Sequence, residues 1–227
     1  MGPTRLLALA AIVLAAGCRP TPAAIVTRRI PVAATPFALA EIARRVGLGR
    51  VSVSDHGEVV LSAAGDPWLD PVAMQSVAAQ VATTLTRHDP AGRGAYLAAA
   101  RAYRAQLGAL DIDYRSSLAD CAHHDIVTAD AAFVPLGRRY NFADHTAGDA
   151  GVAALVSGKG LPVVFTEPAV ATDVVLALAQ ATRTRVDQLD TTTVETPDEV
   201  GRGATYLSLM TDNLVKLRKA LACTAAA

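Results

Sequence analysis

The sequence predicts an α/β protein in which helices cover a parallel sheet. From residue 121 onward, short apolar strand segments alternate with helical segments, which is typical of parallel strands joined by helical crossovers. Two other helical segments carry apolar residues spaced alternately by three and four, so these residues share one helix face. The 227 residues and 52% hydrophobic content allow a sizeable core and exclude a disordered chain.

The N-terminal segment has the pattern of an export signal. Arg5 supplies a positive charge, and the apolar run "LLALAAIVLAA" is too short for a confident membrane span. The run ends in "LAAGC", which resembles the bacterial lipoprotein signal, although an ordinary signal peptide with a chance cysteine is the alternative. We therefore expect a signal peptide at residues 1–17 and a lipid anchor at Cys18. This anchor would hold the chain on the outer side of the bacterial cell membrane.

The next segments predict a small α/β unit followed by two helices. Residues 24–54 have the pattern of a strand, a turn, a helix and a second strand, and the chain then leads directly to Trp68. Asp70 is a good N-cap and Pro71 suits the first helical position, so a helix is expected from Pro71 to about residue 87. Asp89 and Pro90 repeat this cap-and-proline pattern, so a second helix is expected to begin there.

That second helix has an apolar stripe that predicts core packing rather than a stacking surface. The stripe consists of Tyr96, Ala100, Tyr103, Leu107, Leu110 and Tyr114. We expect Asp111 and Asp113, which do not share a helical face, to be solvent-facing charges.

The C-terminal part supplies the strands and helices of the predicted sheet. Strands are expected at "DIVTAD", "LPVVFTE" and "RVDQLD", and helices at "AAFVPLGRRY", "GDAGVAALVSG", "ATDVVLALAQAT" and "ATYLSLMTDNLVKLRKALAC". Cys121 and Cys223 bracket this region. Two cysteines in an exported chain suggest one disulfide, which would fasten the end of the last helix; two buried free thiols are the alternative.

Three acidic residues follow the predicted strands: Asp130, Glu167 and Asp190. Ligands bind beyond the carboxyl ends of parallel strands, so these carboxylates are candidates for a cation site. The alternative is that they are helix caps and solvent-facing ends. The "CAHHD" stretch is too compact for a structural zinc site.

Other function classes find no support in the sequence. Lysine plus arginine and aspartate plus glutamate both number 21, which argues against a nucleic-acid binder. The chain has no recognisable nucleophile–base constellation or glycine-rich phosphate loop, so we expect no enzyme.

The order of the motifs "WLDP", "IVTADAAFVPLGRRY", "VVFTEPAVATDVVLALAQATRTRVDQLD" and "ATYLSLMTDNLVKL" resembles the solute-binding lipoproteins of bacterial zinc and manganese ABC importers. The resemblance implies two α/β lobes, one long linking helix starting at Pro71, and a metal in the cleft between the lobes. It also implies a disulfide between Cys121 and Cys223, as in some members, an ABC permease as partner, and a monomer. On this basis we expect a tether and reduced N-terminal lobe at 18–65, a linking helical segment at 66–119, and the C-terminal lobe at 120–227.

The chain differs from that family at the positions of the expected metal ligands. Members usually read D-P-H-x-W-L-D-P, whereas this chain reads "GDPWLDP", and Asp130 stands where members usually have a histidine. Asp190 alone matches a usual ligand directly. A site of Asp130, Asp190 and Glu167 is all oxygen, while zinc prefers nitrogen and sulfur. The sequence therefore predicts an importer component for zinc or manganese with a degenerate metal site. The alternative is an interaction module derived from the same family that binds no metal.

Overall fold

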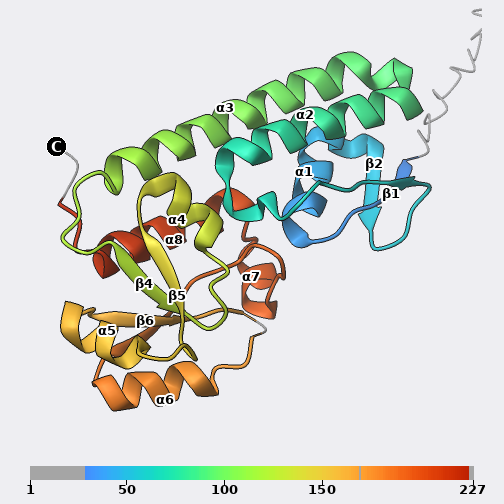
Figure 1. Ribbon diagram of the computed structural model, residues 1–227. Coiled ribbons are helices and arrows are strands. Elements are labelled where there is room, and N and C mark those ends of the chain that lie inside the picture. The colour runs from blue at the N-terminus through green and yellow to red at the C-terminus, as the bar shows by residue number, and fades with distance from the viewer. Residues whose placement is uncertain (1–28, 169, 225–227) are drawn as a thin grey trace, which may run out of the picture.

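The computed structural model describes residues 29–168 and 170–224 as two α/β lobes with a pair of long helices packed along them (Figure 1). The predicted signal peptide, the Cys18 anchor and the tether lie outside the described residues. Within them, every strand pairs in parallel, as predicted. None of the described helices combines the length and the apolar character that a membrane span requires.

The N-terminal lobe is a three-stranded sheet with one helix. The strands β1 (Ile30–Ala33), β2 (Val51–Ser54) and β3 (Val59–Val60) lie in the order β2-β1-β3, and α1 (Phe37–Gly47) packs against them. β3 was not expected from the sequence, because two valines are too short a run to predict a strand.

Two helices leave this lobe after a short 3-10 turn, η2 (Pro67–Leu69). α2 (Pro71–His88) begins as predicted, because the Asp70 side chain accepts hydrogen bonds from the amides of Val72 and Ala73 at 2.9 and 3.1 Å. A second 3-10 turn, η3 (Pro90–Gly92), leads into α3 (Arg93–Ser117). α2 packs on α1, whereas α3 packs on α1 and also on α8 of the other lobe. The helix that links the lobes is therefore α3, and the expectation that it starts at Pro71 was wrong (Figure 1).

The apolar stripe of α3 is buried as predicted, but one acidic residue shares its face. Asp111 is 3% exposed, which corrects the expectation of a solvent-facing charge. One oxygen of Asp111 accepts the Tyr140 hydroxyl at 3.0 Å, and the other pairs with Arg115. The stripe is wider than a strict three-and-four pattern, because position 111 lies between Leu107 and Tyr114 on the helix surface. Asp113 is exposed, as expected.

The C-terminal lobe contains four parallel strands in two ladders, β4–β5 and β6–β7, with β4 and β6 side by side. The strands are β4 (Asp125–Thr128), β5 (Ala143–Thr146), β6 (Val163–Thr166) and β7 (Arg185–Gln188). The helices are α4 (Val134–Tyr140), α5 (Val152–Lys159), α6 (Asp173–Thr182), α7 (Pro197–Arg202) and α8 (Tyr206–Ala220). β5 and α7 were not expected: β5 is polar with no apolar alternation, and α7 has only six residues.

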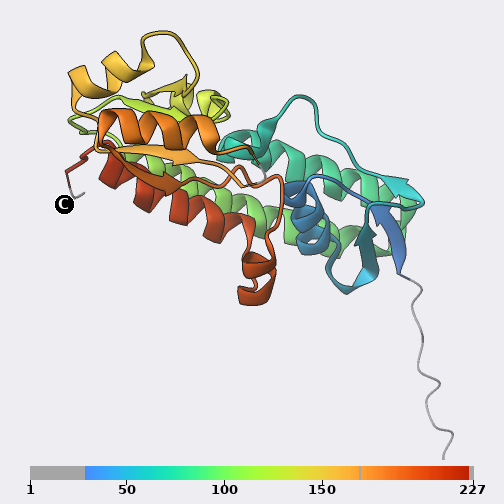
Figure 2. The same cartoon turned by 90° about the horizontal axis from the view of Figure 1, so that it is seen from below.

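The strands of this lobe separate two hydrophobic cores. Ile126 and Phe165 point into the main core, which continues through α3 and α8 into the N-terminal lobe. Val127 and Val164, the next positions along, belong to a smaller core under α5 and α6. This alternation follows from the two-residue period of a strand. Figure 2 shows α8 (red) beside α3 (green) in the C-terminal lobe, while α3 continues to the N-terminal lobe.

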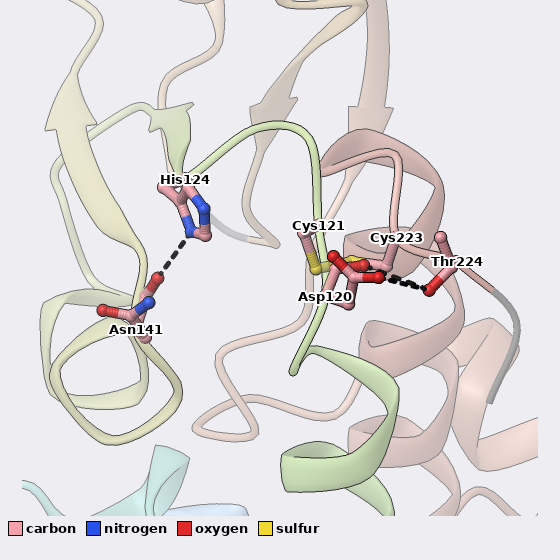
Figure 3. Close-up of a disulfide and its surroundings, with 6 residues drawn as sticks. All are labelled: Asp120, Cys121, His124, Asn141, Cys223 and Thr224. Carbon is pink, nitrogen blue, oxygen red and sulfur yellow. Dashed lines mark hydrogen bonds between the residues drawn. A yellow bond between two sulfur atoms is a disulfide. The ribbon is translucent and has the colours of Figure 1, made fainter.

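A disulfide joins Cys121 to Cys223, as predicted, across a sequence separation of 102 residues (Figure 3). The two cysteines lie just after α3 and just after α8, and beside them the Thr224 amide donates to the Asp120 carbonyl at 3.0 Å. The C-terminal end of α8 is therefore fixed to the segment that enters β4.

The lobes also cap each other's helices. The first amides of α1, at Phe37 and Ala38, donate to the carbonyls of Thr193 and Thr192 at 3.1 and 3.2 Å. In return, the carboxylate of Glu41 on α1 accepts the first amide of α8, at Tyr206. Each lobe thus supplies acceptors for helix ends that would otherwise lack partners.

Candidate functional site

A cavity of about 540 Å³ lies where η2 meets the C-terminal lobe. Trp68 and Leu69 of η2 form one side. The loops after β4, β6 and β7 form the other, which is the carboxyl edge of the strands where ligands usually bind in α/β sheets. The residues that line the cavity are Asp66, Trp68, Leu69, Asp130, Ala131, Ala132, Pro135, Pro168, Val170, Thr191, Thr193 and Val194.

Two contacts fix Trp68 in the cavity wall: a hydrogen bond to its backbone carbonyl, and the contacts of the nearby helix cap, Asp70. Its carbonyl accepts a hydrogen bond from the Thr192 hydroxyl at 3.2 Å, across the two lobes. Two residues later, Asp70 caps α2 and pairs with Arg139 of α4 at 2.6 Å. The tryptophan is 8% exposed. The sequence around it therefore fixes η2 against the other lobe.

Asp130 is an exposed residue at the cavity. One of its oxygens accepts the Ala132 amide at 3.1 Å, so the side chain closes the turn that follows β4. No hydrogen bond or ion pair to its other oxygen, or to the carboxylate of Asp66, is found among the described residues. Asp66 was not selected from the sequence, although its place two residues before the chain's single tryptophan could have drawn attention to it.

Glu167 lies behind the Asp130 turn rather than in the cavity wall. It is 2% exposed, and its two oxygens accept the Ala129 amide at 3.0 and 3.1 Å. Burial raises its pKa to about 6, and the nearby Asp130 charge acts in the same direction. The carboxyl thus joins the end of β6 to the end of β4.

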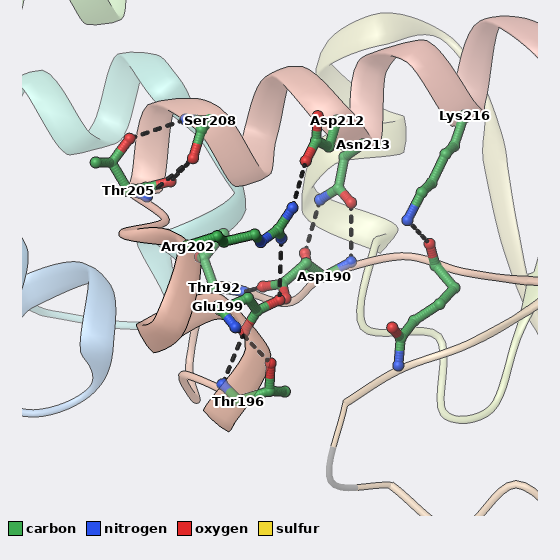
Figure 4. A network of polar contacts seen from close by, with 11 residues as sticks. Asp190, Thr192, Thr196, Glu199, Arg202, Thr205, Ser208, Asp212, Asn213 and Lys216 are labelled. Carbon is green, nitrogen blue, oxygen red and sulfur yellow. Dashed lines mark hydrogen bonds and ion pairs between the residues drawn. The ribbon is translucent and has the colours of Figure 1, made fainter.

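Asp190 belongs to a different network, shown in Figure 4. One of its oxygens accepts the Thr192 amide at 2.5 Å, and the Asn213 side chain holds both the amide and the carbonyl of Asp190 at 2.8 and 2.7 Å. Burial, together with the facing Glu199 carboxyl, raises the pKa of Asp190 to about 7. This network shapes the loop that crosses to the N-terminal lobe.

The structure therefore brings Asp130 and Glu167 near each other and gives Asp190 other partners. Within residues 29–168 and 170–224, no three histidine, cysteine, aspartate or glutamate side chains gather as a metal cluster. None of the five histidines lines the cavity; His124 contacts the Asn141 carbonyl and His145 pairs with Asp125. The three-carboxylate ligand set stays a prediction.

Solved structures with the same fold come from bacterial metal-binding proteins. The metal-dependent lipoprotein YcdH of Bacillus subtilis aligns at 17% identity with a TM-score of 0.73, covering 85% of this chain and 99% of that one. The Zn(II)-bound ZnuA-like domain of Streptococcus pneumoniae AdcA gives the same values. The periplasmic zinc-binding protein TroA of Treponema pallidum aligns at 18% identity with a TM-score of 0.72, covering 85% of this chain and 99% of that one. These likenesses establish the fold.

The sequence comparisons decide the family. No curated protein matches the chain. The family described as the periplasmic component A of the zinc-uptake complex matches residues 52–220. Proteins of this kind bind solutes for transport and are not enzymes, as expected for this chain. On this match and on its fold, the chain belongs to the family of periplasmic zinc-uptake components of metal ABC importers.

Proposed function

We propose that this chain is the solute-binding component of a divalent-metal ABC importer and that its own metal site is degenerate. Family membership and the two-lobed fold support the transport role. The position of the cavity supports it too, because its walls come from η2, at the start of the linking segment, and from the C-terminal lobe.

The observation that carries the degeneracy is the chemistry of the cavity wall. Its ionisable side chains are Asp66 and Asp130, with no histidine or cysteine among the residues that line it. Zinc prefers three or four nitrogen and sulfur ligands, whereas carboxylates suit manganese, magnesium or calcium. The cargo ion, zinc or manganese, would meet an all-oxygen site. Glu167 and Asp190 do not line the cavity, and each already accepts a backbone amide.

The remaining parts of the proposal concern attachment and partners. A lipid on Cys18 would tether the chain to the cell membrane, outside the cytoplasm, and a membrane permease would receive the solute. The chain would act as a monomer, with the boundaries 1–17, 18–65, 66–119 and 120–227 given above. The "LAAGC" pattern supports the tether.

A second candidate is an interaction module of the same ancestry that carries no metal. The apolar side chains in the cavity wall favour it, because they carry no atom that coordinates a metal ion. These side chains are Trp68, Leu69, Pro135, Pro168, Val170 and Val194.

Calorimetric titration of the chelator-treated full chain with zinc and with manganese tests the proposal. We expect dissociation constants weaker than about 10 µM for both ions, because an oxygen-only site with few ligands binds them loosely. Asp130→Ala should abolish any residual affinity, while the exposed Asp113→Ala on α3 serves as the matched control.

The outcomes separate the candidates. Sub-micromolar zinc binding that depends on Asp130 would mean that an effective site exists, and the degeneracy would be wrong. Complete absence of binding to either ion would favour the interaction module. Residual binding that Asp130→Ala leaves unchanged would remove Asp130 from the ligand set.

A further inference from the structure

The cavity between η2 and the C-terminal lobe is large for a single ion. A metal with ligands at about 2.0–2.6 Å occupies only a small part of such a space. The 540 Å³ instead falls within the range of about 300–1,000 Å³ that small organic ligands occupy. The volume of the site thus has room for a small organic molecule as well as for an ion.

The wall of the cavity is apolar with a negative charge. Six of its side chains are tryptophan, leucine, proline or valine, and the ionisable ones are Asp66 and Asp130. Among the described residues no lysine or arginine lines it, so no described side chain of the wall neutralises these carboxylates. Asp66 has no hydrogen-bond or ion-pair partner among the described residues. The side chains that line the cavity therefore favour a cation over an anion or a neutral molecule.

The chemistry of the wall also specifies the kind of cation. A small, strongly hydrated ion gains nothing from leucine, proline and valine, whereas an organic cation buries its apolar body against them. Tryptophan is the aromatic side chain that attracts ammonium groups most strongly. The Thr191 and Thr193 side chains add hydroxyl groups at the same wall.

We propose that the cavity between η2 and the loops after β4, β6 and β7 binds an organic ammonium ion with an apolar body. Asp66 and Asp130 supply the charge, and Trp68 and its apolar neighbours bind the body. This inference rests on the proposed solute-binding role and gives the cavity a solute of a different class from the metal.

The chain contains its own reporter for this binding. Trp68 is the only tryptophan in the sequence and lines the cavity, so its fluorescence responds to an occupant. The full chain is titrated with phenyltrimethylammonium in the presence of a chelator, which excludes metal effects. We expect a saturable fluorescence change with a dissociation constant of about 1 mM or tighter, as befits a ligand of this size. Tetramethylammonium, which lacks the apolar ring, should bind about tenfold more weakly.

Variants and a second ligand make the test selective. The double variant Asp66→Asn/Asp130→Asn should weaken phenyltrimethylammonium binding about tenfold or more, while Asp113→Asn should leave it unchanged. Each single variant should weaken it several-fold, which preserves the test if the double variant is not folded by circular dichroism. Benzoate, an aromatic anion, should cause no saturable change.

Either of two results would overturn the inference. One is the absence of a saturable response to phenyltrimethylammonium in the folded chain, and the other is binding that benzoate matches or that the Asp66 and Asp130 variants retain. These results are independent of the zinc and manganese titrations, because a chain without ammonium binding can still show weak or tight metal binding.

Discussion

The acidic residues of the cavity and those of the network around Asp190 lie at the same edge of the C-terminal sheet but in opposite situations. In the cavity, Asp66 and one oxygen of Asp130 have no hydrogen-bond or ion-pair partner among the described residues. In the network, Asp190 is 7% exposed; one of its oxygens and its backbone are held by Thr192 and Asn213, while its other oxygen is buried without a hydrogen-bond partner among the described residues (Figure 4).

The difference separates two uses of one residue type. A carboxylate that accepts buried amides is already committed, and removing it leaves those amides without an acceptor. A carboxylate on an open wall without such donors is available to a solute, and its removal costs the fold little. Both kinds of carboxylate follow the end of a strand, so position does not distinguish them. The hydrogen-bond donors around each carboxylate do.

The largest effect should come from Asn213→Ala. Asn213 is fully buried, and its side chain is the partner of both the amide and the carbonyl of Asp190. Losing two buried hydrogen bonds should lower the free energy of unfolding by about 3–4 kcal/mol, measured by denaturant unfolding. The neighbouring, exposed Asp212→Ala is the control and should change it by less than about 0.5 kcal/mol. Equal effects of the two variants would contradict the structural role of the network.

A smaller difference should separate Asp190→Ala from Asp130→Ala. The first leaves the buried Thr192 amide without its acceptor and should cost about 2 kcal/mol. The second should cost less than about 0.5 kcal/mol, because water can reach the exposed turn after β4. If Asp130→Ala were the more destabilising variant in the same unfolding assay, Asp130 rather than Asp190 would have the structural role.

The last effect concerns pH and Asp144 on β5. This carboxylate accepts the Thr128 hydroxyl and the Phe133 amide, both at 2.8 Å, and burial raises its pKa to about 7. A pKa that is higher in the folded than in the unfolded chain stabilises the fold at low pH. This contribution is lost as the pH rises from about 4 to about 7.

The free energy of unfolding should therefore fall across that pH range, and Asp144→Asn should make the fall shallower. Asp113→Asn, at an exposed site, should leave the slope unchanged. Denaturant unfolding at a series of pH values measures both slopes. A slope that Asp144→Asn does not alter would show that this carboxyl does not titrate as described.

The local features of the fold were readable from the sequence, while contacts between distant segments were not. The Asp70 cap, the apolar face of α3 and the strand ends at Asp130, Glu167 and Asp190 depend on neighbouring residues, and each was anticipated. Asp111 was misjudged because its burial depends on Tyr140, which lies 29 residues further along. The α7 helix was missed although its "TPDE" start is a capping box, which a search for that motif would have found.

The candidate site, too, depends on contacts between distant segments that the sequence did not reveal. The three carboxylates were chosen correctly as strand-end residues, but their hydrogen-bond partners decide what each can do. Glu167 accepts an amide 38 residues away and Asp190 is held by a side chain 23 residues away. Asp66 was passed over, because only the folded chain places it beside the loops after β4 and β7.

The reciprocal capping of α1 and α8 means that neither half of the chain is a complete protein. A gene fragment encoding the first lobe alone would lose the acceptors of the opening α1 amides, and Glu41 would lose the Tyr206 amide. A fragment encoding the second lobe alone would lose the acceptor at the start of α8. We therefore expect the two lobes to fold as one cooperative unit, because each supplies acceptors that the other lobe's helices need.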